Sequence, residues 1–195
     1  MTTVVELEKV SKVAPKRFSV EDFRKMTEAG ILPEESGWEI IDGKIIDKIK
    51  ISSRNAGAVR RLNKVLANLV GNQTLISIRN PIHIDDYNEP EPDIALLKRR
   101  SDFYRKGHPL PQDVLLLIEV SDSTIEYDRE IKKVIYAEAE IVEFWLVNLQ
   151  DNTVEVYSQP KNGNYRLARI LESGETIEAT AVENLKLQID EILGL

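Results

Sequence analysis

Two short apolar runs constrain the fold of this 195-residue chain more than any other feature. Residues 114–120 are apolar except for Glu119, and residues 94–97 are wholly apolar. Runs of this length without alternation are typical of strands that are buried on both faces. Because such strands need a layer on each side, the two runs predict the middle of a sheet that is covered by other elements.

The segments before these runs predict two helices and a hairpin. Residues 19–29 begin with Ser19 followed three residues later by Asp22, a helix N-terminal signal, and Gly30 ends the pattern. Two β-branched runs around the dipeptide Asp42-Gly43 predict a tight hairpin. Apolar positions at helical spacing over residues 53–70 predict an amphipathic helix with a basic outer side.

The segments after residue 71 predict strands around one more helix. Residues 74–84 alternate like a half-exposed strand, and residues 128–140 predict a helix with Asp128 as its N-cap. Further strands are predicted at 143–149, 153–158 and 164–170, with a short closing helix at the carboxyl end. This order predicts an α+β protein, α/β-like in having a mixed sheet that is flanked by helices.

Composition predicts one globular domain in the cytoplasm. The chain has 42% hydrophobic and 30% charged residues, and no apolar run reaches the roughly 18 residues that a membrane span needs. The amino-terminal sequence lacks the apolar core of a signal peptide. We expect residues 1–17 to form a loosely ordered arm and residues 18–195 to form a single domain, with no membrane contact.

Residue types restrict the possible metal chemistry and nucleic-acid contacts. The chain contains no cysteine, so a metal would be held by oxygen ligands or by the two histidines, which favours a hard cation such as Mg²⁺. A net charge of −7 argues against a surface that is basic throughout. Two local clusters, residues 44–64 and 98–106, are basic nevertheless, although exposed charge runs are usually only solvated surface.

Three polar residues stand where a buried apolar environment is expected. Asp93 follows Pro92 at the entrance to one apolar strand, and Glu119 lies near the end of the other. Two such carboxylates repel each other unless a cation lies between them, so their convergence would indicate a metal site. Lys132 falls within the early turns of the following helix and could reach both acids. The simpler interpretation makes Asp93 a turn residue and Lys132 a solvated lysine.

Several longer segments resemble the Uma family of restriction endonucleases, which is also known as a domain of unknown function and is placed in the PD-(D/E)XK nuclease superfamily. The resemblance runs from about Phe18 to Leu193. It is carried by WEIIDGKI at 38–45, NPIHIDDYNEPEPDIALLKRRSDFY at 80–104, LLLIEVSDSTIEYDREIKKVIYA at 115–137 and IVEFWLVNL at 141–149. The resemblance implies a restriction endonuclease-like PD-(D/E)XK core.

The resemblance also implies a set of site residues. Asp93 would be the aspartate of the PD motif and Glu119 the acid of the E-x-K element, and together they would hold Mg²⁺ or Mn²⁺. Ser121 stands where the standard pattern has lysine, and in this family the lysine is thought to migrate to the next helix, which matches Lys132. Glu39 corresponds to an acid that often approaches the metal from the amino-terminal part of the fold.

Two positions depart from the family pattern. Many members carry a histidine at the start of the helix after the hairpin, where this chain has Arg54-Asn55-Ala56. Members also commonly read Gly-(Ile/Val)-Pro where this chain has Glu140-Ile141-Val142. The first departure, the absence of this histidine, would remove a substrate or metal contact. The resemblance also implies an additional metal ligand, the main-chain carbonyl of Val120, which any residue at that position would supply.

Three classes of function follow. The leading hypothesis is a Mg²⁺-dependent endonuclease that hydrolyses phosphodiester bonds in DNA as a homodimer, with Lys132 orienting or deprotonating the attacking water or stabilising the transition state. The alternative is a catalytically weak or inactive nuclease-fold protein that binds nucleic acid or a protein partner. A purely structural domain, the third class, predicts that Asp93 and Glu119 do not converge.

Overall fold

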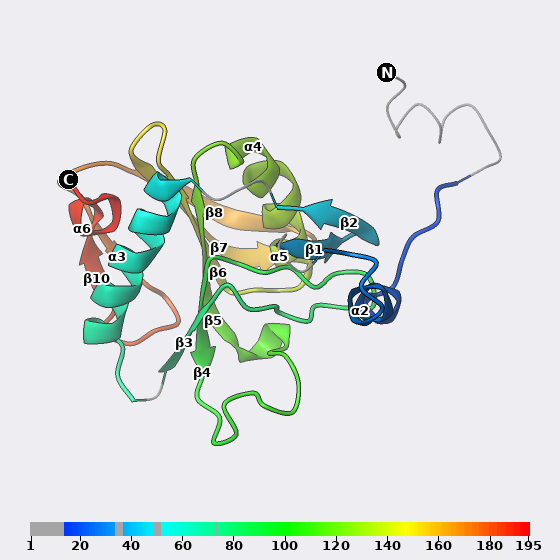
Figure 1. Cartoon of the computed structure of the whole chain (residues 1–195). Helices are drawn as coiled ribbons and strands as arrows, with labels where there is room; N and C mark the ends of the chain where they lie inside the picture. The colour runs from blue at the N-terminus through cyan, green and yellow to red at the C-terminus, as the bar shows by residue number, and fades with distance from the viewer. Residues whose placement is uncertain (1–13, 34–36, 49–51, 73) are drawn as a thin grey trace.

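The computed structural model describes residues 14–33, 37–48, 52–72 and 74–195 (Figure 1). Most of the arm that we expected at residues 1–17 lies outside these ranges, as does the end of the expected hairpin at 49–51. Within the described ranges, no helix combines the length and the apolar character that crossing a membrane requires.

Six strands form one mixed sheet in the order β3-β4-β5-β6-β7-β8. The pair β5 and β6 is parallel, and the other neighbours are antiparallel. The strands are β3 (Thr74–Ile78), β4 (Ile94–Lys98), β5 (Val114–Ser121), β6 (Glu143–Asn148), β7 (Thr153–Lys161) and β8 (Asn164–Leu171). The two apolar runs are therefore adjacent central strands, as predicted.

Helices cover both faces of this sheet (Figure 1). One face packs on α3 (Ser53–Leu69) and α6 (Ile189–Leu193) through a core that includes Leu62, Ile118 and Trp145. The other face packs on the crossover between the parallel strands, whose Tyr136 contacts the core around Leu117. The crossover consists of α4 (Ile125–Tyr127), the π-helical turn η2 (Asp128–Lys132) and α5 (Lys133–Glu138). The predicted mixed sheet flanked by helices is confirmed.

The crossover helix begins earlier than the sequence predicted. Its first turn is α4, which follows Thr124, and the buried Asp128 lies inside the helical segment. The carboxylate of Asp128 accepts hydrogen bonds from the hydroxyls of Ser121 and Thr124 instead of from free backbone N–H groups. The prediction of Asp128 as the N-cap was therefore wrong. Its carboxylate is directed inward because two hydroxyl donors at the end of β5 satisfy it there.

Smaller elements close the fold. The helix α2 (Val20–Glu28) has the predicted capping box between Ser19 and Asp22. A 3₁₀ turn, η1 (Pro111–Asp113), precedes β5. Two three-residue strands, β9 (Thr176–Glu178) and β10 (Lys186–Gln188), pair antiparallel and add Ile177 and Leu187 to the core beneath α3. The sequence did not predict this last pair.

The predicted hairpin is a separate two-stranded sheet of β1 (Trp38–Ile41) and β2 (Lys44–Asp47). Its turn residues Asp42 and Gly43 both have positive φ, 52° and 68°, as a two-residue hairpin turn of this kind requires. The turn is tied to the rest of the fold because Gly43 N–H donates to the carbonyl of Tyr87 at 2.9 Å. The hairpin thereby holds β1 beside the end of the main sheet.

We expect Gly43→Ala to lower the free energy of unfolding by about 1–2 kcal/mol. A Cβ at this position would lie 2.7 Å from Cβ of Arg17 and 3.0 Å from the carbonyl oxygen of Phe18, in addition to the positive φ. Gly57→Ala is the matched control, since a methyl group added at this position in α3 would have no neighbour within 4 Å and alanine favours helix. Urea denaturation measures both variants, and equal stability of Gly43→Ala and wild type would contradict the prediction.

Candidate active site

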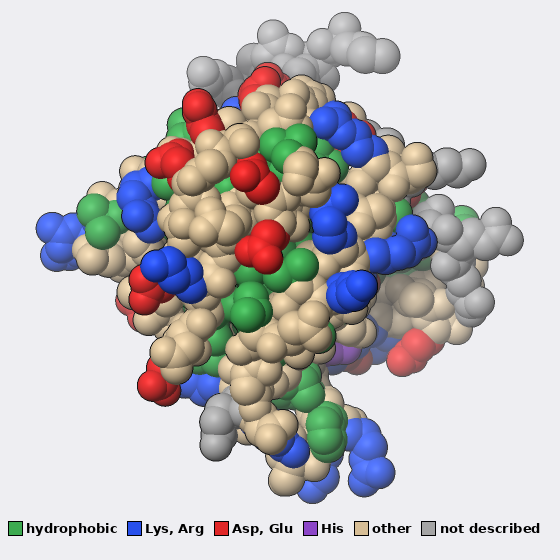
Figure 2. Space-filling view, turned by 90° about the vertical axis from the view of Figure 1, so that its left-hand side faces the viewer, with side chains coloured by type: hydrophobic (Ala, Val, Ile, Leu, Met, Phe, Trp, Pro, Cys, Tyr) green, Lys and Arg blue, Asp and Glu red, His purple; other side chains and the backbone are tan. Residues whose placement is uncertain are grey.

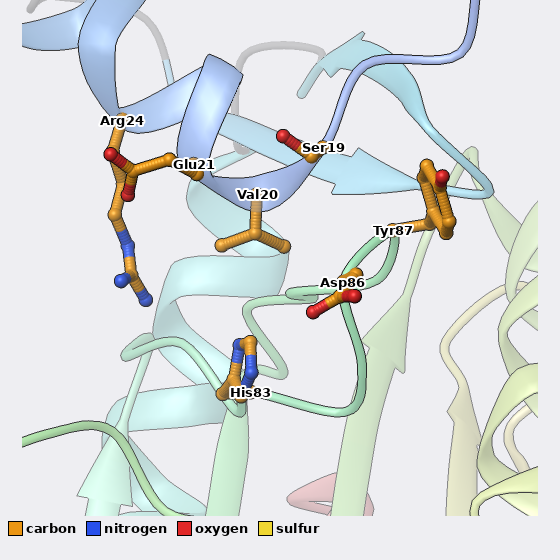
Figure 3. Close-up of a pocket in the computed structure, with 7 residues that line it drawn as sticks. All are labelled: Ser19, Val20, Glu21, Arg24, His83, Asp86 and Tyr87. Carbon is orange, nitrogen blue, oxygen red and sulfur yellow. The ribbon is translucent and has the colours of Figure 1, made fainter.

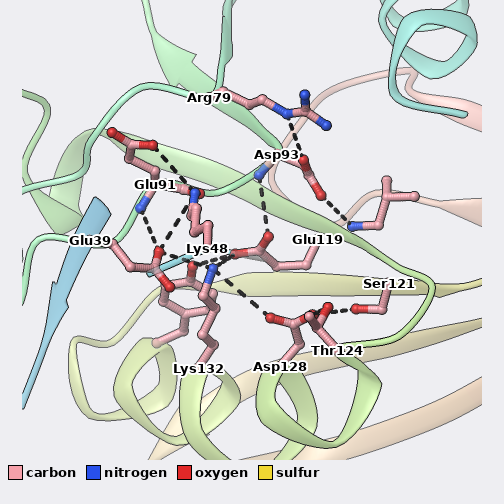
Figure 4. Close-up of polar contacts among 12 residues, drawn as sticks. Glu39, Lys48, Arg79, Glu91, Asp93, Glu119, Ser121, Thr124, Asp128 and Lys132 are labelled. Carbon is pink, nitrogen blue, oxygen red and sulfur yellow. Dashed lines mark hydrogen bonds and ion pairs between the residues drawn. The ribbon is translucent and has the colours of Figure 1, made fainter. Parts of the chain in front are cut away.

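The register of β4 and β5 brings Asp93 and Glu119 together. Ile94 pairs with Ile118, so Asp93, one residue before β4, lies opposite Glu119. The N–H of Asp93 donates to Oε2 of Glu119 at 3.3 Å, and the N–H of Val120 donates to Oδ2 of Asp93 at 3.0 Å. Figure 4 shows the two carboxylates at the same end of the sheet. This convergence contradicts the third class of function, which predicted that the acids lie apart.

Lys132 completes the predicted constellation from the crossover. Its ammonium lies 2.9 Å from Oε1 of Glu119, 3.2 Å from Oε2 of Glu39 and 3.9 Å from Oδ1 of Asp128. Only 3% of the residue is exposed, which excludes the interpretation as a solvated lysine. The parallel pairing of β5 and β6 forces the chain to cross this face of the sheet. The first turns of the crossover therefore lie over the end of β5, where Glu119 is.

Glu39 is also part of this cluster. It is 1% exposed on β1 and accepts the N–H of Glu91 at 3.2 Å. Besides Lys132, it has a second cation within reach, the ammonium of Lys48 at 3.7 Å. Lys48 in turn donates to the carbonyl of Glu91 at 2.6 Å. Glu39 thus faces the two lysines, and the structure brings all four residues predicted from the resemblance into one network.

The electrostatics of this network keep opposite charges paired. Burial acts to lower the pKa of Lys132, but the carboxylates of Glu119 and Glu39 outweigh it and raise that pKa well above its ordinary value. Burial raises the pKa of Glu119 to about 7, against the opposing effect of Lys132. Burial has the same tendency at Glu39, yet Lys132 and Lys48 prevail and hold its pKa below the usual range.

Two residues that the sequence did not predict as site residues complete the cluster, Arg79 by contacting Asp93 and Asn55 by contacting Arg79 and Val120. The Nε of Arg79 donates to Oδ1 of Asp93 at 2.9 Å, and its Nη2 donates to Oδ1 of Asn55 at 2.7 Å. The side-chain amide of Asn55 also donates to the carbonyl of Val120. Asn55 belongs to the segment that departs from the family pattern, and this departure could have marked it as a site residue. No feature of the sequence marked Arg79.

The donor set fits a hard divalent cation. Asp93, Glu119 and the carbonyl of Val120 offer oxygen ligands, and Mg²⁺ needs few of these because it keeps several waters. Each of these ligands already accepts a hydrogen bond. Arg79 donates to Asp93 and Asn55 donates to the carbonyl of Val120. Lys132 and the hydroxyl of Tyr136, the latter at 2.7 Å, donate to Glu119. Among the residues that the structure describes, no group of three or more acidic or histidine side chains is arranged to hold a metal.

Two pockets lie apart from these acids. A pocket of about 370 Å³ lies between α2 and residues 83–87, and Figure 3 shows Arg24 and His83 directed toward it. Both of these side chains contact Glu89, at 2.7 Å and 3.0 Å. A second pocket of about 300 Å³ lies at the end of α3 near Phe103. Neither includes any of the four predicted site residues.

The outer side of α3 carries basic residues, as the sequence predicted, and some of them are engaged within the fold. Figure 2 shows that the face formed by α3 and the carboxyl-terminal segment carries basic and acidic side chains interspersed. Arg54 is 3.6 Å from Asp122, and Arg61 donates to the carbonyl of Leu193 at 2.6 Å, so both are partly used within the fold. Arg60 and Lys64 remain exposed on this helix.

This arrangement, a mixed sheet flanked by helices with acids at one end, is that of a restriction endonuclease-like fold. The chain belongs to the Uma2 family, whose description is "Putative restriction endonuclease", since the family's sequence model matches residues 20–190. Its structure is similar to the crystal structure of a protein described as "a putative nuclease belonging to DUF820" from Anabaena variabilis. That similarity has a TM-score of 0.69 at 18% identity and covers 91% of this chain and 98% of the other. No curated protein matches the sequence.

Proposed function

We propose that this protein is a Mg²⁺-dependent or Mn²⁺-dependent endonuclease that hydrolyses phosphodiester bonds in DNA. The single observation that carries the proposal is the convergence of Asp93 and Glu119 beside the buried ammonium of Lys132: the N–H of Asp93 donates to Glu119 at 3.3 Å, and the N–H of Val120, the residue after Glu119, donates to Asp93 at 3.0 Å. The family description and the shared fold support the same class of chemistry.

In this proposal the acids hold the cation and Lys132 positions them. A bound divalent cation would supply charge neutralisation at the scissile phosphate and a more acidic water. Asp93 and Glu119, with the carbonyl of Val120, would be its protein ligands. The ammonium of Lys132 is surrounded by carboxylates and has almost no exposed surface. It therefore fixes the orientation of Glu119 and offsets the charge of the acids.

Contacts to the DNA backbone would come from cations around the site. Arg54, at the start of α3, is about half exposed, with 52% of its side chain accessible. The basic loop at residues 98–106 and the exposed Arg60 and Lys64 are further from the acids in the fold and would add non-specific attraction. Because one active site would cut one DNA strand, we predict that the protein acts as a homodimer to cleave both strands of a duplex. Light scattering on the purified protein measures that state.

Supercoiled plasmid tests the proposal directly. We expect conversion of the plasmid to nicked or linear forms in Mg²⁺ or Mn²⁺, and no conversion in EDTA, because the acids need a cation to bind a phosphate. Calorimetric titration with Mn²⁺ should show binding to wild type and weaker binding to Asp93→Asn. Failure of the wild-type protein to bind Mn²⁺ and to cut any DNA substrate would contradict the proposal.

A second candidate function is nucleic-acid binding without cleavage. It is favoured by the side chain of Asn55, which lies in the segment that lacks the histidine of many family members and donates to the carbonyl of Val120, a proposed metal ligand. This function predicts salt-sensitive DNA binding with no product in either metal. The same plasmid assay, run beside a DNA-binding measurement, separates the two functions.

A further inference from the structure

Arg79 occupies an unusual place at the end of β3. Its guanidinium lies between two strands and a helix, bonded to Asp93 at 2.9 Å and to Asn55 at 2.7 Å. These two bonds use Nε and Nη2, and within the described part of the chain the third nitrogen, Nη1, has no hydrogen-bond partner. The side chain of Arg79 is 28% exposed, and Figure 4 shows it beside the proposed metal ligand Asp93.

The backbone at Arg79 is shaped to deliver this side chain. Its φ is +50°, in the left-handed region that non-glycine residues seldom adopt. Its N–H donates to the carbonyl of Asp93 at 3.2 Å, which extends the hydrogen bonding between the two chain segments by one residue beyond β3 before the chain turns. A left-handed conformation is unfavourable for a non-glycine residue and is frequent at functional sites. At Arg79 it accompanies the side-chain contacts with Asp93 and Asn55.

The partner of Arg79 is itself held firmly. Asn55 lies in the first turn of α3, where its N–H donates to the hydroxyl of Ser52 at 3.1 Å. Its amide is fixed at both ends, since it donates to Val120 and accepts from Arg79. The guanidinium consequently has a defined plane and position next to Asp93. A planar guanidinium fixed by two of its donors can present the remaining N–H groups to a phosphate.

We propose that Arg79 is a ligand of the substrate phosphate at this site, held in position by Asn55. This inference rests on the proposed function. When a cation neutralises Asp93, the carboxylate no longer depends on Arg79 for its charge, and the guanidinium can share its donors with a phosphate oxygen. Without a cation, Arg79 is the counter-charge of Asp93 and competes with metal binding.

A merely structural arginine would give different results. If Arg79 only balances the charge of Asp93, its removal changes metal binding and stability but leaves DNA affinity unchanged once a cation is bound. A phosphate ligand instead contributes to DNA affinity in the presence of the cation. It also contributes to the salt dependence of binding, because each phosphate contact releases counterions and adds about 0.9 to the magnitude of the slope of log K against log salt.

The experiment compares Arg79→Ala, Arg79→Lys and wild type, with Arg166→Ala as the control. Arg166 is an exposed arginine on β8, the strand at the opposite edge of the sheet from β3. Fluorescence anisotropy measures the binding of a DNA duplex in Ca²⁺ over a series of salt concentrations, and electrophoresis verifies that the DNA stays intact. Titration with Mn²⁺ in the absence of DNA measures cation affinity, and thermal unfolding verifies the fold.

For Arg79→Ala we expect DNA affinity to fall about tenfold and the salt slope to become shallower by about 0.9, while Mn²⁺ binds at least as tightly as to wild type. Arg79→Lys should keep most of the salt slope but lose affinity, since it retains the charge without the planar fork. This variant also preserves the test if Arg79→Ala does not fold. Arg166→Ala should match wild type in both assays.

Two results overturn the inference in distinguishable ways. If both Arg79 variants bind DNA with wild-type affinity and salt slope while wild type binds Mn²⁺, Arg79 is only the counter-charge of Asp93, and the proposed function stands without this contact. If wild type binds neither Mn²⁺ nor DNA, the proposed function fails and the inference fails with it.

Discussion

Lys132→Met is expected to lower the free energy of unfolding by about 3–5 kcal/mol, the range observed when one partner of a buried ion pair is removed. Glu119, Glu39 and Asp128 are only 4%, 1% and 5% exposed, and the substitution removes the ammonium that lies among them. Methionine fills a similar volume, so the loss would come from charge rather than from a cavity. Urea denaturation followed by the fluorescence of the buried Trp145 measures the effect.

Lys133→Met is the matched control for this substitution. Lys133 is adjacent in the chain but partly exposed, and its ammonium lies 5.2 Å from the ring centroid of Tyr157. Loss of a contact of that kind costs about 0.5–1 kcal/mol. The control also separates the effect of Lys132 from that of the neighbouring lysine. Equal effects of the two substitutions would show that the carboxylates do not depend on Lys132.

Local patterns predicted most of the fold because its central elements are locally determined. The apolar runs of β4 and β5, the helical spacing of α3 and the turn dipeptide Asp42-Gly43 each carry their own signal. The pair β9 and β10 has three residues in each strand, which is too short for a periodic pattern. The sequence placed the start of the crossover helix too late, because Asp128 follows a polar segment and aspartate is common at N-caps. In the structure its carboxylate instead accepts from the hydroxyls of Ser121 and Thr124, which precede the helix.

The site was predictable in so far as its residues break a local rule. Glu119 interrupts one apolar strand and Asp93 stands at the entrance to another, and a single antiparallel register brings them together. Arg79 and Asn55 break no such rule in the sequence. Arg79 follows β3 and contacts Asp93, whereas Asn55 lies on α3 and contacts Arg79. The two residues are 24 positions apart, so only the packing of α3 against the sheet makes them neighbours. The left-handed backbone at Arg79 is likewise visible only in the structure.

Lys132 shows how the site tolerates a serine at the position where the standard nuclease pattern has lysine. Ser121 is buried at the end of β5 and donates its hydroxyl to Asp128. That hydrogen bond holds the π-helical turn against the strand, and Lys132 is the last residue of this turn. Ser121 thus helps to fix the element that carries Lys132, the lysine that the resemblance assigns to the site, 2.9 Å from Glu119.

Glu119→Gln is expected to reduce metal-dependent DNA cleavage by roughly 1,000-fold, comparable to the removal of one principal electrostatic group from an active site. Glutamine keeps the shape and one acceptor oxygen, so Lys132 and Tyr136 can still donate to it, but the ligand charge for the cation is lost. The plasmid assay measures cleavage, and Mn²⁺ titration should show weakened binding. Near-ultraviolet circular dichroism verifies that the core around Trp145 is intact.

Glu89→Gln provides the control for this loss of activity. Glu89 is another buried glutamate, 4% exposed, that is paired with cations, since Arg24 lies 2.7 Å and His83 3.0 Å from its carboxylate. Its substitution removes a buried charge near the hairpin without touching Asp93, Glu119 or Lys132. Cleavage by this variant should stay near the wild-type rate even if its stability falls. Wild-type cleavage by Glu119→Gln would contradict the assignment of Glu119 as a metal ligand, whereas equal losses in both variants would show that activity follows stability rather than the charge at position 119.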